Sequence, residues 1–275
     1  LVGSEMCIRD SLYTSHDEDD AQGYGFKMLD WQLYTSTDMV NWTDHGPIAS
    51  LKDFTWRKRD NGAWALQVVE RNGKFYMYCP LHGNGIGVLV SDSPYGPFKD
   101  PIGKPLVWQK EHWDDIDPTV YIDDDGQAYI YNGGGGTCKG GRLKDNMMEL
   151  DGAMRTMEGL VDFHEATWIH KYNGVYYLPY SDNHEPGQEG VAGWNRMHYA
   201  ISDHPLGPWK HMGIYMQPTR PETGVTNHGS IVQYKGQWFA FYHNSALSGD
   251  PWLRSVCVDR LYHNADGTIR MVEQR

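Results

Sequence analysis

The sequence contains no run of basic residues and no long apolar run. Its 24 Lys and Arg residues are outnumbered by 36 Asp and Glu residues, so the formal net charge is -12. Nucleic-acid binding draws its affinity from clustered Lys and Arg, so this composition excludes a nucleic-acid partner. A helix that spans a bilayer needs about 20 consecutive apolar residues, and every apolar run falls far short of that length. We therefore expect no membrane partner either.

Cysteine is also scarce. The four cysteines, Cys7, Cys79, Cys138 and Cys257, are widely spaced and match no zinc-ligand pattern. We therefore expect free thiols rather than a metal site or a disulfide framework. No predicted disulfide therefore indicates an exported protein, and the sequence does not predict the cellular compartment.

Glycine and aromatic residues are plentiful, and they recur in a pattern. Four segments share one plan: an apolar strand, a polar turn that ends in glycine, and an aromatic strand. This plan is typical of β-hairpins, with glycine where the turn needs a positive φ. The segments are "VVERNGKFYMY" with Gly73, "VYIDDDGQAYIY" with Gly126, "WIHKYNGVYYLPY" with Gly174 and "IVQYKGQWFAFY" with Gly236.

A second marker sets the length of the repeat. Aspartates recur at spacings of 54, 53, 58 and 56 residues, at Asp38, Asp92, Asp145, Asp203 and Asp259. Units of this length with four short, aromatic-rich strands are typical of β-propeller blades. A β-sandwich would use similar strands, but it has no reason to repeat at a fixed period. The sequence therefore predicts an all-β fold, a five-bladed β-propeller.

Matched positions of the repeats carry candidate site residues. Counting back nine residues from each turn glycine gives Trp64, Asp117, Glu165 and Asn227, with His228 beside the last. The first strand of every propeller blade lines the central channel. We therefore expect these strand starts to converge at one end of the channel, where two carboxylates and an imidazole would meet.

Each of these residues also has a structural interpretation. Asp117 precedes Pro118, and Asp-Pro readily starts a turn, while His228 could be a hydrogen-bonded core histidine. Glu165 lies among apolar and aromatic residues, where an unpaired carboxylate costs several kcal/mol. The matched register favours a shared site instead. Two acids facing each other suit glycoside hydrolysis, in which one protonates the leaving oxygen while the other activates water or attacks the sugar carbon.

Four ordered segments extend the repeats: "DPTVYIDDDGQAYIY", "HEATWIHKYNGVYYLPYSD", "NHGSIVQYKGQWFAFYHN" and "RSVCVDRLYHNADGTI". With them, nearly the whole chain from Leu12 onward resembles glycoside hydrolase family 43. The resemblance implies a five-bladed propeller that hydrolyses β-xylosidic or α-L-arabinofuranosidic bonds of hemicellulose, with inversion at the anomeric carbon. The expected partners are hemicellulose-derived oligosaccharides.

The resemblance also implies roles for the matched residues. Glu165 matches the general acid of the family, and Asp117 matches a carboxylate whose negative charge keeps that acid protonated near neutral pH. His228 matches a central histidine that in many members contacts a calcium ion, directly or through water. Calcium prefers oxygen ligands, so water would have to complete the shell. No organic cofactor is implied.

Four further residues match sugar-binding positions. Trp64 occupies the place of an aromatic residue beside the bound sugar, although Leu66 stands where the family commonly has proline. Arg254 matches an arginine that reaches the sugar hydroxyls, with a surface ion pair as its alternative. His16 and Asp17 would line the rim of the pocket from the first blade, and a solvated acidic loop explains them equally well.

The third acid of the family, its general base, is an Asp near the start of the first blade. Counting back from Tyr13 places a turn glycine near position 7 or 8, where no glycine stands, and the base at or before residue 1. Asp10 lies too close to the strand to replace it. We therefore expect residues 1–11 to be a non-native or unstructured leader and residues 12–275 to form one catalytic propeller with an incomplete first blade. General-base help is worth about 10²- to 10⁴-fold in rate, so this chain would have weak activity or none.

Two other functions stay open at this point. A non-catalytic sugar-binding propeller would keep Trp64 and Arg254, but it has no need of two acids at matched strand starts. A related propeller that cleaves fructosides would retain the anomeric configuration, so product stereochemistry separates it. The choice between xylosides and arabinofuranosides depends on loops such as Asp182–Trp194.

Overall fold

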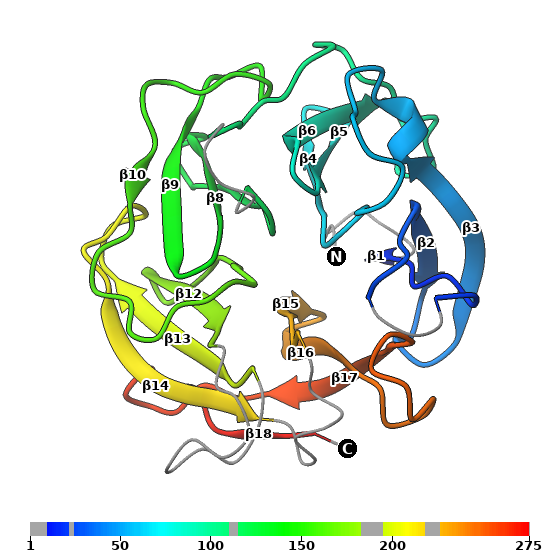
Figure 1. Ribbon diagram of the computed structural model, residues 1–275. Coiled ribbons are helices and arrows are strands. Elements are labelled where there is room, and N and C mark those ends of the chain that lie inside the picture. Colours follow the sequence, from blue (N-terminus) through cyan, green and yellow to red (C-terminus); the bar gives the residue numbers. More distant parts are fainter. Residues whose placement is uncertain (1–9, 22–24, 110–114, 183–194, 218–225, 275) are drawn as a thin grey trace. The chain divides into compact units, whose positions relative to one another are not determined.

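The computed structural model describes residues 10–21, 25–109, 115–182, 195–217 and 226–274. Within these ranges the chain forms eighteen strands and one 3₁₀-helix, and most of the strands are labelled in Figure 1. That helix, η1 (Leu51–Asp53), has three residues, and no described helix could span a bilayer. The predicted all-β class is therefore confirmed.

The strands of the described ranges form five separate sheets, one for each predicted repeat. Their orders are β1-β2-β3, β4-β5-β6, β10-β9-β8-β7, β11-β12-β13-β14-β18 and β15-β16-β17. The last strand of the chain, β18, runs parallel to β14 at the edge of the fourth sheet. The bounds are β1 (Asp10–Ser15), β2 (Asp30–Ser36), β3 (Trp42–Ser50), β4 (Gln67–Arg71), β5 (Lys74–Leu81), β6 (Gly85–Ser91), β7 (Thr119–Ile122), β8 (Ala128–Gly134), β9 (Thr137–Leu143), β10 (Arg155–Thr156), β11 (His170–Tyr172), β12 (Val175–Ser181), β13 (Met197–Ser202), β14 (Lys210–Gln217), β15 (Gly229–Tyr234), β16 (Gln237–Asn244), β17 (Ser255–Leu261) and β18 (Val272–Glu273).

The four predicted hairpins are confirmed as β4–β5, β7–β8, β11–β12 and β15–β16. Their turn glycines have φ values between 76° and 84°; they are Gly73, Gly126, Gly174 and Gly236. In three of the turns the residue before glycine is left-handed as well; these are Asn72, Asn173 and Lys235. Two consecutive positive φ values give the turn whose twist suits neighbouring antiparallel strands.

The aspartate marker holds in four repeats and is wrong in the fifth. The first four aspartates follow β2, β6, β9 and β13 closely; they are Asp38, Asp92, Asp145 and Asp203. Asp259 instead lies inside β17, where it accepts a hydrogen bond from the Tyr242 hydroxyl at 2.7 Å. The matching place after β17 belongs to Tyr262 and His263. The fourth spacing, from Asp203 to Asp259, therefore agreed with the period by coincidence.

The chain divides into two compact units. Unit 1 comprises Leu1–Ile130 and Arg142–Ala153, and unit 2 comprises Tyr131–Gly141 and Met154–Arg275. Of the predicted leader 1–11, residues 1–9 lie outside the described ranges, whereas Asp10 and Ser11 open β1. That residues 12–275 form one catalytic propeller stays a prediction.

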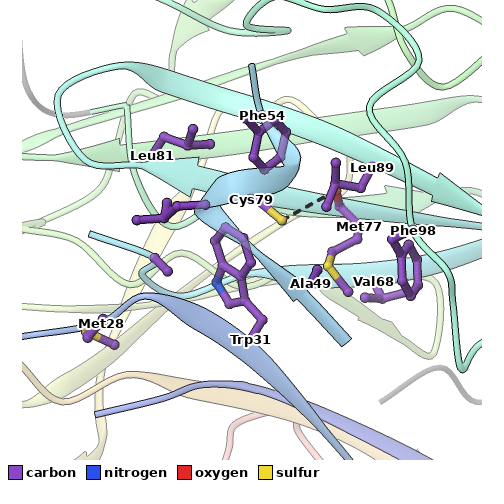
Figure 2. Close-up of a cluster of buried hydrophobic side chains, with 12 residues drawn as sticks. Met28, Trp31, Ala49, Phe54, Val68, Met77, Cys79, Leu81, Leu89 and Phe98 are labelled. Atoms are coloured by element: carbon purple, nitrogen blue, oxygen red, sulfur yellow. Dashed lines mark hydrogen bonds between the residues drawn. The ribbon is translucent and has the colours of Figure 1, made fainter. Parts of the chain in front are cut away.

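The core of unit 1 is drawn from its first two sheets, as Figure 2 shows. The rings of Trp31 and Phe54 meet edge to face, with centroids 6.3 Å apart at an angle of 84°. Such aromatic pairs contribute about 0.5–1.5 kcal/mol beyond the burial of their surface. Phe54 also lies against the backbone of β6, because a Cβ atom added at Gly87 would be 2.3 Å from its ring.

The core of unit 2 gathers tyrosines and histidines. Tyr177 and Tyr199 are buried, and the rings of Tyr172 and His263 stack with centroids 3.9 Å apart. His170 stacks on Tyr177 at 5.0 Å. Burial lowers the pKa of His170 well below its usual value and that of His263 to about 4. Both imidazoles are therefore neutral at pH 7.

Three of the four predicted free thiols lie in the described ranges and are confirmed as free. Cys79 and Cys138 are buried, whereas Cys257 is half-buried. The Cys79 sulfur donates a long hydrogen bond to the Met77 carbonyl at 3.8 Å, drawn dashed in Figure 2. Cys7 lies outside the described residues.

Gly87→Ala tests the close packing of Phe54 on β6. The added methyl group would lie 2.3 Å from Cε1 of Phe54, and overpacking of this kind costs about 1–3 kcal/mol of unfolding free energy. We expect the urea midpoint to fall accordingly. Gly141→Ala is the matched control, because its added Cβ would meet the flexible Met154 side chain at 3.0 Å. Equal losses in the two variants would contradict a specific role for the Phe54 contact.

Candidate active site

Trp64 follows a turn that Asn61 builds in unit 1. The side-chain oxygen of Asn61 accepts hydrogen bonds from the backbone N–H groups of Met28 and Gly62, each at 2.8 Å. The indole N–H of Trp31 donates to the Trp64 carbonyl at 2.7 Å. The backbone that carries the predicted sugar-binding indole is therefore fixed to the first sheet.

His82 stacks on the Trp64 indole. The ring centroids are 4.1 Å apart, with 26° between the planes. A Cβ atom at Gly62 would lie 2.4 Å from Cβ of His82, so the stack requires glycine there. The pKa of His82 is lowered by burial and then by the positive charge of Arg59. A neutral imidazole therefore covers one face of the indole, and a sugar could stack only on the other.

Asp117 lies directly before β7. It is buried, with 5% of its surface exposed, and its φ is +53°, a left-handed conformation that costs a non-glycine residue of order 1 kcal/mol or more. The Val120 N–H donates to the side-chain oxygen of Gln67, which joins β7 to β4. Asp117 lies three residues before Val120, and Trp64 lies three residues before Gln67. Both predicted site residues therefore enter joined strands in matched register.

His16 is engaged with acids of unit 1. Its Nδ1 lies 3.1 Å from Oδ1 of Asp30 and 3.7 Å from a carboxylate oxygen of Glu18. The three ligand atoms lie within 4.8 Å of one another, a spacing that suits a shared cation or the His16–Asp30 hydrogen bond alone. Asp17, the other predicted rim residue, is half-buried between His16 and Glu18.

Glu165 lies in unit 2, five residues before β11. Its side chain is 15% exposed, and Nε2 of His164 is 3.6 Å from one of its oxygens. Its backbone pairs with Ser181 at the end of β12, and the Ser181 N–H donates to its carbonyl at 2.9 Å. The next residue, Ala166, has a φ of +63°. The backbone around this predicted acid thus resembles that at Asp117, with a left-handed residue at the entry to the sheet.

His228 enters β15 opposite His243, because the next pair in the register is Gly229 with Tyr242. Burial, and after it the positive charge of Arg254, lower the pKa of His228 to about 4. The same two causes, with His228 added, hold the pKa of His243 well below its usual value. Two neutral imidazoles therefore lie beside a cationic guanidinium at pH 7. A neutral imidazole nitrogen can serve as a metal ligand.

Glu165 and His228 also enter joined strands. The indole N–H of Trp168 donates to the Ile231 carbonyl at 2.9 Å. Trp168 lies three residues after Glu165, and Ile231 lies three residues after His228. Unit 2 therefore repeats the arrangement that unit 1 has at Asp117 and Trp64.

The model of the family described as "Glycosyl hydrolases family 43" matches residues 10–269. The chain belongs to this family. It is therefore a glycosidase by class.

Relatives in the family are similar over most of the chain. A xylosidase/arabinosidase of Bacteroides ovatus is 34% identical over 313 residues, which covers 95% of this chain and 90% of that protein. The solved structure of an α-L-arabinofuranosidase from Clostridium thermocellum is 39% identical, with a TM-score of 0.82, and covers 98% of this chain and 91% of that one. The likeness confirms the predicted propeller class.

Another structure comes from a compost microbial metagenome. It is a family-43 β-xylosidase/α-arabinofuranosidase in complex with xylotriose, in a calcium-free form. Its sequence is 32% identical, its TM-score is 0.82, and the match covers 96% of this chain and 91% of that one. A calcium-free form implies that calcium binding occurs in the family.

Sequence reasoning missed several residues of these surroundings. His82 lies 18 residues after Trp64, and only the glycine of "NGAW" signals the close approach that their stack needs. His243, in "FYHN", lies near the end of the aromatic strand β16 and could have been paired with His228 from the hairpin register. Asp182 and Asn195 stand at positions that neither the turn glycines nor the aspartate spacing marks.

Arg254→Met tests the electrostatic coupling in unit 2. Removing the positive charge should raise the pKa of His228 from about 4, while burial still holds it below the usual value of about 6.5. NMR titration of the histidine side chains would measure it. Arg260→Met, which removes an exposed charge of β17, is the control. An unchanged His228 pKa in Arg254→Met would contradict the coupling.

Proposed function

We propose that this family-43 chain hydrolyses β-D-xylosidic or α-L-arabinofuranosidic bonds of hemicellulose-derived oligosaccharides, with inversion at the anomeric carbon. Glu165 acts as the general acid, and Asp117 is the second carboxylate. The observation that carries the proposal is that both acids are withdrawn from water, each shortly before the first strand of its sheet and nine residues before its turn glycine. The names of the relatives supply the substrate class.

The two carboxylates have different tasks in this proposal. Glu165 delivers its proton to the leaving oxygen as the glycosidic bond breaks, so it must be protonated when the substrate binds. A neighbouring negative charge raises the pKa of an acid, and this is the task assigned to Asp117. Such general-acid help contributes about 10²- to 10⁴-fold to the rate.

The sugar would be held by a flat surface and by hydrogen-bond donors. The Trp64 face opposite His82 offers a platform of the kind that suits a sugar ring. The Arg254 guanidinium has several N–H groups of the kind that donate to sugar hydroxyls, and its Nη1 donates to the Thr226 hydroxyl. His16 and Asp17 are assigned to the rim.

A calcium ion would be held by His228. The low pKa of this half-buried residue, about 4, keeps the imidazole neutral and so able to donate a nitrogen lone pair. One nitrogen does not satisfy calcium, which takes six to eight ligands and prefers oxygen, so water would supply most of the shell. The ion would add positive charge and ordered water beside the strand start.

Residues 12–275 are assigned to one catalytic propeller, and the general base is assigned to none of the described residues. The test therefore uses two proteins: this chain, and a version whose first eleven residues are replaced by a strand that carries Asp-Pro. Binding of xylotriose is measured for both, because binding does not need the base.

Hydrolysis of aryl β-D-xyloside and aryl α-L-arabinofuranoside tests the acid. We expect the version with the Asp-Pro strand to be active. Glu165→Gln in that version should lower its rate about 10²- to 10⁴-fold. The loss should shrink with a dinitrophenyl leaving group, because that group departs without a proton. Glu158→Gln, which changes an exposed acid of unit 2, should keep full activity.

The products and the binding data separate the alternatives. NMR of the first product should show inverted configuration, and retained configuration would favour the mechanism of the fructoside-cleaving propellers. If both proteins bind xylotriose but cleave no glycoside, and Glu165→Gln and Asp117→Asn leave binding intact, the chain is a sugar-binding propeller instead.

The calcium assignment predicts a thermal shift. An ion that binds only the folded protein raises its melting temperature, so excess CaCl₂ should raise it relative to EGTA. His228→Ala should abolish the difference, whereas His45→Ala, at an exposed position of β3, should keep it. A shift that survives in His228→Ala would assign the ion to another site.

A further inference from the structure

A buried ionic group lies at the end of β12 in unit 2. The Asp182 side chain is fully buried, and its carboxylate accepts hydrogen bonds from the Arg196 N–H at 2.7 Å and from Nε of Arg196 at 2.6 Å. Nε2 of His198 lies 2.8 Å from the same carboxylate. Burial alone would raise the pKa of Asp182, but the hydrogen bonds from His198 and Arg196 outweigh it and lower the pKa. The group is therefore an ionised, tightly held anchor.

Asn195 connects this anchor to a second segment. Its amide nitrogen donates to the Asp182 carbonyl at 2.8 Å, and its amide oxygen accepts a hydrogen bond from the Thr226 N–H at 3.0 Å. The side chain is 3% exposed. Both polar ends of a buried amide are thus used, and they join residues that are 44 positions apart in the sequence.

Thr226 has an uncommon backbone conformation. Its φ is +54°, which is a genuine outlier for a β-branched residue and strains the backbone. Such a conformation persists only when the surroundings impose it, and the hydrogen bond to Asn195 is one of the contacts that do so. The Thr226 hydroxyl accepts a hydrogen bond from Nη1 of Arg254 at 3.0 Å.

We propose that Asn195 is a positioning residue for Arg254. Anchored at Asp182, it holds Thr226 in the left-handed conformation that presents its hydroxyl to the guanidinium. An arginine side chain loses rotamer entropy when it is fixed, so a preset acceptor lowers the cost of placing Arg254 at a sugar. This inference rests on the proposed role of Arg254 in binding the sugar.

The first measurement is the dissociation constant of xylotriose by calorimetry. Asn195→Ala should weaken binding about 5- to 20-fold, as expected when a hydrogen bond that places a charged group is lost. In an Arg254→Met background the same change should alter binding less than about 2-fold, because its effect passes through Arg254. Equal weakening in both backgrounds would overturn the proposal and leave Asn195 with a structural role.

A second measurement does not depend on sugar. Phenylglyoxal modifies free guanidinium groups, and mass spectrometry reports its rate at each arginine. Asn195→Ala should raise the rate at Arg254 several-fold relative to the exposed Arg260. If wild-type protein fails to bind xylotriose but this rate rises, the proposed substrate is wrong and the positioning of Arg254 stands. An unchanged rate overturns the positioning itself.

Two substitutions at Thr226 complete the test. Thr226→Val removes the hydroxyl and keeps the shape, so it should reproduce both effects, and it carries the test if Asn195→Ala does not fold. Thr226→Ser keeps the hydroxyl and removes the β-branch, which lowers the strain of a positive φ. In the Asn195→Ala background it should restore most of the binding. Failure of Thr226→Val to change either readout would overturn the proposal.

Discussion

Hydrogen bonds that join neighbouring sheets at or just before their first strands are the constraint on which the candidate site depends. In unit 1 the Val120 N–H donates to Gln67, and in unit 2 the Trp168 indole donates to the Ile231 carbonyl. All four partners lie three residues after a candidate site residue. A slip of one residue in a strand turns its side chains to the opposite face, so these bonds determine which side chains the strand starts present.

Burial imposes the second constraint, and it acts differently on acids and bases. An isolated buried charge costs so much that the group either neutralises or acquires partners. His228 and His243 take the first course, with pKa values held low by burial and by Arg254. Asp182 takes the second and stays ionised through Arg196 and a histidine. Unit 2 therefore contains two neutral imidazoles, which can serve as metal ligands, and the ionised carboxylate of Asp182.

Local chemistry explains how much of this could be predicted from the sequence. The hairpins followed from glycines at the turns, and Asp117 and Glu165 were found because a fixed spacing from those glycines places a residue at the strand start. The stack of His82 on Trp64 and the bonds of Asn195 were not predicted, because they join residues that no repeat brings into register. The aspartate spacing gave one wrong prediction, because Asp259 lies inside β17 rather than after it.

The hydrogen bonds of Asn195 affect which sequence changes near the candidate site the protein can tolerate. The Asn195 amide donates to the Asp182 carbonyl, so two residues that are 13 positions apart in the sequence are joined directly. The entropy of closing a loop grows only slowly with its length, by about 0.6 kcal/mol for each doubling. Insertions or deletions between the two residues would therefore cost little stability while Thr226 and Arg254 keep their places. Changes in the sequence between Asp182 and Asn195 could therefore alter the substrate range while Arg254 keeps its position.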